Sequence, residues 1–195
     1  MRKIGIIRAL EVASLILFLA VLSFGQRTAG LKVEKGGKAK PVTAEDSQGK
    51  KLTLDQYKGK LVLLDFWATW CPPCIEEIPT VKQLYKKYHK QGFEIIGFAL
   101  DQDGETVTDF VEEHKMPWRQ VLDGARYEGK FSDNYGVRFI PTMILLGPDG
   151  KVLDTQARGA RLRTLVPEHI KSVTNKRPVV ISGHDSPGEK QESNE

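Results

Sequence analysis

The sequence has very little cysteine, since only Cys71 and Cys74 occur among its 195 residues. A zinc site would need two further ligands, and a c-type haem attachment motif would need histidine where Ile75 stands. A purely structural disulfide would close so short a loop that little chain entropy would be removed. The four histidines fall singly, without ligand spacing: His89, His114, His169 and His184. We therefore expect no metal and no cofactor.

A large excess of one charge is also missing. The chain has 29 basic and 25 acidic residues, for a net charge of +4, and no basic face or aromatic platform is evident. Nucleic acid is therefore not an expected partner. The apolar content of 40% suffices for one core. We expect one domain over residues 39–174, preceded by a linker at 26–38 and followed by a disordered polar tail at 175–195.

Residues 1–25 are of a different kind, with a basic start and an apolar run from Val12 to Phe24. This composition is typical of a secretory signal peptide. The alternative is an N-terminal membrane anchor, because Ile4 to Phe24 is long enough to span a bilayer, although Arg8 and Glu11 lie inside it. Either outcome predicts an extracytoplasmic domain, secreted or held at the outer face of the membrane.

The pattern of apolar residues predicts the α/β class. Leu61 to Phe66 is a nearly continuous apolar run, as in a strand covered on both faces, and only Asp65 interrupts it. Pro79 should kink the helix that follows, Gly92 should end it, and Pro167 should be tolerated only near the start of the last helix. Strands are expected at 42–44, 51–53, 61–66, 93–100, 118–122, 142–146 and 152–157, and helices at 72–91, 105–115, 130–135 and 161–174. This order predicts a mixed sheet with helices on both faces.

The two cysteines lie where the expected central strand meets the following helix. Free N–H groups and the helix dipole at a helix N-terminus favour a thiolate. Two thiols with two residues between them can close a small disulfide ring and open it again. The pair therefore indicates thiol–disulfide exchange.

The segment from Asp65 to Cys74, Asp-Phe-Trp-Ala-Thr-Trp-Cys-Pro-Pro-Cys, resembles the active-site segment of thioredoxin-fold proteins. It is most similar to the secreted or membrane-anchored thiol–disulfide oxidoreductases of the TlpA/ResA type, and the resemblance covers residues 39–172. It implies a thioredoxin-like fold with a central mixed sheet flanked by helices, and an extra β/α insertion at 102–123. Two residues depart from the family pattern: Asp65 replaces a common asparagine, and Phe139 replaces a commonly small residue.

The resemblance and the spacing together assign roles to the cysteines. Cys71, at the more exposed edge of the helix start, should be the nucleophile, and the more buried Cys74 should be the resolving thiol of a redox-active Cys71–Cys74 disulfide. Asp65 should lie buried beneath them with a raised pKa, ready to take the proton of Cys74. Glu77, one turn beyond Cys74, could transfer protons too. The alternatives are a hydrogen-bonded core acid for Asp65 and a solvated helix charge for Glu77.

Substrate docking is expected around Trp70, Ile140 and Pro141. Pro141 resembles the family's cis-proline, and a cis bond would leave the backbone of Ile140 to pair with a substrate strand. Trp70 should shape the site rather than react.

Pro72 and Pro73 lack N–H groups that would stabilise a thiolate, which favours a reducing couple. The sequence therefore predicts an extracytoplasmic disulfide reductase. Its partners would be disulfide-bearing proteins, with apocytochrome c as one candidate, and a membrane or extracytoplasmic electron donor. The alternatives are an oxidase or isomerase of secreted proteins, a redox sensor, and a peroxidase, although the cysteine context of peroxiredoxins is absent.

Overall fold

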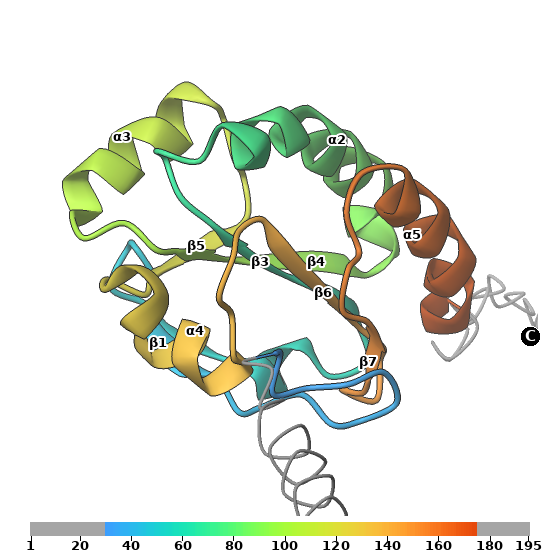
Figure 1. Ribbon diagram of the computed structural model, residues 1–195. Helices are drawn as coiled ribbons and strands as arrows, with labels where there is room; N and C mark the ends of the chain where they lie inside the picture. The colour runs from blue at the N-terminus through green and yellow to red at the C-terminus, as the bar shows by residue number, and fades with distance from the viewer. Residues whose placement is uncertain (1–29, 175–195) are drawn as a thin grey trace, which may run out of the picture.

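The computed structural model describes residues 30–174, which form a five-stranded sheet, a small hairpin and surrounding helices (Figure 1). The strands are β1 (Thr43–Glu45), β2 (Lys51–Thr53), β3 (Leu61–Trp67), β4 (Phe93–Ala99), β5 (Arg119–Leu122), β6 (Thr142–Leu146) and β7 (Val152–Asp154). The α-helices are α2 (Pro72–Tyr88), α3 (Gly104–Glu113), α4 (Lys130–Tyr135) and α5 (Gly159–Thr174). Three short 3-10 helices are η1 (Leu54–Tyr57), η2 (His89–Gln91) and η3 (Arg126–Glu128).

Strand β3 lies at the centre of the sheet, whose order is β5-β4-β3-β6-β7. All seven residues of β3 are buried, as its continuous apolar run predicted. It runs parallel to β4 and antiparallel to β6, and β4 runs parallel to β5. The carboxyl ends of β3, β4 and β5 therefore meet at one end of the sheet, and β6 begins there. We call this the carboxyl end of the sheet.

Helices cover both faces of the sheet, as predicted: α2, α3 and α5 lie on one side and α4 on the other (Figure 1). Helix α2 forms because its buried residues recur every three or four positions: Cys74, Ile78, Val81, Leu84 and Tyr88. Phe66 packs toward α4, where its ring lies 5.6 Å from that of Tyr135, whereas Trp67 packs on Phe110 of α3. Because strand side chains alternate, Asp65 shares the face of Trp67, beneath α2 and α3.

Two prolines lie within helices. Pro79 is inside α2, and Pro167 is inside α5. The expectation that Pro167 stands near a helix start is wrong, because α5 begins at Gly159. A proline removes one helical hydrogen bond, but four buried side chains of α5 hold the helix in place despite this loss: Leu162, Val166, Ile170 and Val173.

The segment before residue 39 does not behave as the expected linker where the structure describes it. Val33 is buried, Lys32 donates its N–H to the carbonyl of Tyr135, and Gly36 donates to the carbonyl of Val152. Residues 30–38 therefore belong to the packed domain. The expected signal peptide or anchor at 1–25, the rest of the linker and the tail at 175–195 lie outside the described residues. Between residues 30 and 174, no helix is both long and apolar enough to cross a bilayer.

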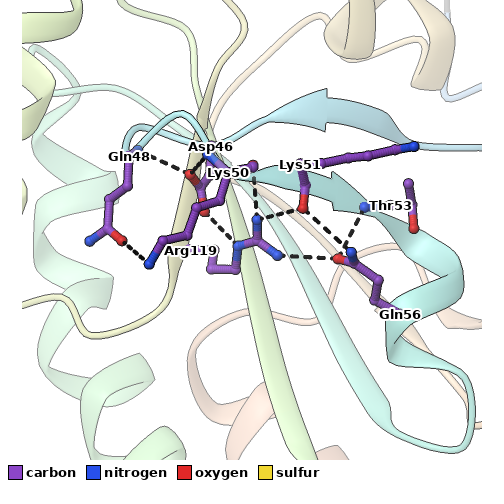
Figure 2. A network of polar contacts seen from close by, with 7 residues as sticks. All are labelled: Asp46, Gln48, Lys50, Lys51, Thr53, Gln56 and Arg119. Atoms are coloured by element: carbon purple, nitrogen blue, oxygen red, sulfur yellow. Dashed lines mark hydrogen bonds and ion pairs between the residues drawn. The ribbon is translucent and has the colours of Figure 1, made fainter.

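Arg119 of β5 holds the β1–β2 hairpin against the sheet (Figure 2). Its Nε donates to Oδ2 of Asp46 at 2.6 Å, and its Nη2 donates to the carbonyls of Lys50 and Lys51, each at 3.0 Å. Burial of Asp46 acts to raise the pKa of its carboxyl, but hydrogen bonds from backbone N–H groups and from Arg119 outweigh burial and lower it. The buried carboxylate thus stays charged and paired.

Candidate active site

Cys71 and Cys74 form a disulfide at the start of α2, with an S–S distance of 2.08 Å. Cys71 is the N-cap residue, and Cys74 is in the first turn. The sequence placed Cys71 at the more exposed edge of the helix start and Cys74 deeper, but the two residues are almost equally buried, at 4% and 3% exposure. Exposure therefore does not distinguish their roles, and the assignment of Cys71 as nucleophile rests on its place at the N-cap and on resemblance.

Few hydrogen-bond donors reach the sulfur of Cys71. Pro72 and Pro73 occupy the first two helical positions and have no N–H groups. The N–H of Cys74 lies 3.3 Å from Sγ of Cys71, and in the described structure it is the one donor that bonds this sulfur. A thiolate at Cys71 would therefore have less backbone stabilisation than at an ordinary helix N-terminus.

Asp65 is a buried acid on the face of β3 that lies beneath α2 and α3, and it is 4% exposed. Its Oδ1 has no hydrogen-bond partner among the described residues. Burial, and to a smaller extent the negative charge of Glu77, raises the pKa of this carboxyl to about 7. The unpartnered oxygen does not fit the alternative of a fully hydrogen-bonded core acid, and a carboxyl with this pKa can exchange a proton near neutral pH.

Glu77 is half-buried on α2 and is not the solvated helix charge that the sequence left open. Its Oε2 accepts the N–H of Gly159 at 3.0 Å, so it bonds the first residue of α5. Its charge also acts on Asp65. The structure therefore brings together two acids that are separated in the sequence, and it places them on the strand and the helix that flank the disulfide.

The peptide bond between Ile140 and Pro141 is cis, as the resemblance implied. Pro141 is buried, Ile140 is half-buried, and Phe139 is 56% exposed. The hydroxyl of Thr142 donates to the carbonyl of Phe139 at 2.7 Å and fixes the turn into β6. Because β6 begins at the carboxyl end of the sheet, this turn lies at the same end as the disulfide.

Sequence reasoning missed two polar contacts that support the site. Asp101 is buried after β4 and accepts both the N–H and the hydroxyl of Thr69, two residues before Cys71. Trp67 donates its indole N–H to the side chain of Gln120 at 3.0 Å. An aspartate directly after an apolar strand was a usable signal for the first contact. No sequence signal pointed to the contact between Trp67 and Gln120, because the two residues are 53 positions apart.

Comparisons with known proteins agree with this geometry. The family model described as Redoxin matches residues 34–165. The thiol-disulfide oxidoreductase ResA of Bacillus thuringiensis subsp. konkukian is 35% identical over 150 residues, covering 77% of this chain and 84% of the relative. ResA of Bacillus subtilis (strain 168) is 36% identical over 121 residues, covering 62% and 66% respectively.

Solved structures give the same result. The thioredoxin domain of a thiol-disulfide oxidoreductase from Bacteroides vulgatus has a TM-score of 0.66 and 31% identity, covering 71% of this chain and 99% of that domain. A thiol:disulfide interchange protein DsbE from Chlorobium tepidum has a TM-score of 0.64 and 27% identity, covering 73% and 99%. The structural matches cover most of the described domain, and the family model's range of 34–165 includes both cysteines and Pro141.

Proposed function

The chain belongs to the Redoxin family as a ResA-type thiol–disulfide oxidoreductase, and we propose that it reduces disulfide bonds of other proteins outside the cytoplasm. The comparisons confirm the predicted family, the thioredoxin-like fold and the enzyme class. The direction of exchange, the place and the partners are the proposal. The observation that supports the proposal is the Cys71–Cys74 disulfide at the start of α2, where a single backbone N–H donates to the sulfur of Cys71.

The reaction begins with the dithiol form. The Cys71 thiolate attacks one sulfur of a substrate disulfide, forming a Cys71–substrate mixed disulfide. The other substrate sulfur leaves as a thiolate and takes a proton from water. The position of Cys71 at the N-cap of α2, together with the resemblance, supports its role as the attacking thiol.

The second step releases the substrate. Cys74 loses its thiol proton to Asp65, and its thiolate attacks the Cys71 sulfur of the mixed disulfide. The Cys71–Cys74 disulfide forms, and the second substrate sulfur leaves as a thiolate that is then protonated. Two electrons have passed from the protein to the substrate. The raised pKa of Asp65 supports this role, because a carboxylate with a pKa of about 7 is a stronger base than an exposed aspartate.

The two prolines favour reduction as the direction. A poorly stabilised thiolate makes the dithiol form less stable relative to the disulfide, which lowers the reduction potential of the couple. Such a protein gives up electrons readily and must receive them again from a dithiol donor at the membrane or outside the cytoplasm. The basic and apolar residues 1–25 support this location. Apocytochrome c, whose cysteines must be reduced before haem is attached, is one candidate substrate.

The test is reduction of insulin by the protein with dithiothreitol as electron source, together with a redox titration against glutathione. We expect insulin to precipitate faster with the wild-type protein, no acceleration with Cys71→Ser, and a potential well below that of strong oxidants, which lie near −120 mV. The Cys74→Ser variant should accumulate mixed disulfides with its substrates. A potential near that of the strong oxidants would instead show an oxidase.

A further inference from the structure

The largest exposed apolar side chains of the described domain gather at the carboxyl end of the sheet. They are Trp70 at 44%, Leu122 at 41% and Phe139 at 56% exposure. Trp70 precedes Cys71, Leu122 ends β5, and Phe139 leads into β6. All three therefore lie at the same end of the sheet as the disulfide.

Arg126 adds a positive charge to this surface. Its guanidinium lies 5.2 Å from the centre of the Trp70 ring, and its side chain is exposed. In the described structure the guanidinium forms no ion pair and no hydrogen bond to a carboxylate. None of its five N–H donors has a partner among the described residues, so they are available to a ligand near Trp70, the residue before Cys71.

The backbone holds Arg126 in this position. Its φ angle is 53°, in the left-handed region that residues other than glycine adopt at a cost. Its N–H donates to the carbonyl of Leu100, just after β4. The carbonyl of the next residue, Tyr127, lies 3.5 Å from Nη1 of Arg138, the neighbour of Phe139, which is the outer limit of a hydrogen bond and does little to position Arg126. The segment therefore lies between Trp70 and the turn that carries Phe139.

We propose that Arg126, placed on Trp70 beside the disulfide, selects substrate chains that carry an aspartate or glutamate next to the cysteine to be reduced. Guanidinium groups bind carboxylates through two parallel hydrogen bonds, and the ring of Trp70 keeps the planar guanidinium oriented. The three apolar side chains supply contact area without choosing among substrates. The ion pair supplies the preference.

Arg138 provides a matched control from the same surface. It is also exposed, but its Nη2 donates to Oδ1 of Asp133 at 3.0 Å and its Nη1 donates to the carbonyl of Val137 at 3.0 Å. Its donors are engaged within the protein. Replacing Arg138 removes the same positive charge, but it does not remove a guanidinium that is free to bind a carboxylate of the substrate.

The inference rests on the proposed function, and the test separates the two. The probes are two peptides with one cysteine joined to 2-thiopyridine, identical except for glutamate or glutamine beside the cysteine. Release of 2-thiopyridone is followed in a stopped-flow instrument with the pre-reduced protein. We expect wild type to react about threefold faster with the glutamate peptide, since exposed ion pairs change equilibria by factors of roughly 1.4 to 5. The ratio should fall to about one in Arg126→Gln.

Three further results complete the test. Arg126→Lys should keep part of the preference, Arg138→Gln should keep the wild-type ratio, and added salt should reduce the ratio in wild type. Equal ratios in wild type and Arg126→Gln overturn the inference, even when both proteins react well and reduce insulin. A wild-type protein that reacts with neither peptide contradicts the proposed exchange chemistry, and the inference falls with it.

Discussion

Replacement of Asp65 by asparagine should make the protein more stable above neutral pH and should slow the release of substrate from the mixed disulfide. The Asp65 carboxyl is buried, its Oδ1 has no partner, and its pKa is raised from 3.8 to about 7. A shift of this size corresponds to roughly 4 kcal/mol, because a tenfold change in proton affinity is 1.36 kcal/mol. This figure is an upper bound, since the asparagine amide must itself be accommodated in the same buried place.

The sign of the pH dependence follows from which state keeps the proton. Between pH 3.8 and about 7 the unfolded chain loses the Asp65 proton while the folded protein retains it. Wild-type stability should therefore fall as pH rises through this range and should level off above it. Asp65→Asn has no carboxyl at this position and should lack that fall. We expect the two proteins to be similar near pH 4, and the variant to be about 2–4 kcal/mol more stable near pH 8.

The assay is urea unfolding of both oxidised proteins at several pH values, followed by tryptophan fluorescence. Asp101→Asn serves as a control, because its amide has only one uncharged acceptor oxygen where the carboxylate accepts both the N–H and the hydroxyl of Thr69, so it should be less stable than wild type near neutral pH. In turnover, Asp65→Asn should slow release of substrate from the mixed disulfide and should lose the rise in rate through pH 7. Parallel stability curves for wild type and Asp65→Asn would refute the buried, proton-binding carboxyl.

Two other substitutions test the remaining parts of the structure. Pro73→Ala returns an N–H donor to the start of α2 and should raise the reduction potential by about 30 mV, if one such bond stabilises the Cys71 thiolate by about 1.4 kcal/mol. Equilibration with glutathione at alkaline pH measures this, and Pro79→Ala, farther along the helix, should leave the potential unchanged. Asp46→Asn should cost about 2–3 kcal/mol at pH 7, because it leaves Arg119 without its carboxylate. Since the pKa of Asp46 is lowered, this loss should shrink as pH falls through that lowered pKa, which urea unfolding at pH 3 and pH 7 would show.

Features that depend on neighbouring residues could be predicted from the sequence. The continuous apolar run gave the buried β3, the spacing of apolar residues gave α2, and Gly92, with a φ of 104°, ends the helical segment as expected. The disulfide followed from two cysteines at a strand–helix junction. The cis bond before Pro141 needed the resemblance, because nothing in the local composition distinguishes it from an ordinary proline.

Features that depend on distant residues could not be predicted. The bond between Glu77 and Gly159 joins positions 82 residues apart, and the ion pair of Asp46 with Arg119 joins positions 73 residues apart. Neither charge pattern nor periodicity specifies such partners, since they arise only when the elements pack. The sequence placed Cys71 at the more exposed edge of the helix start, but it is 4% exposed, because burial depends on how the whole domain packs.

The N-terminal part of the domain also protects the sheet from unwanted pairing. At one outer strand, the N–H of Ser47 bonds the carbonyl of Gln120 in β5. At the other, residues 36–38 bond Val152 and pair with Lys151 beside β7. Unpaired outer strands invite aggregation with extended chains, and the proposed exchange with protein disulfides would bring other chains to this domain. The contacts at β5 and β7 occupy part of each outer strand, whereas the carboxyl end of the sheet, where the disulfide lies, is where another chain would bind.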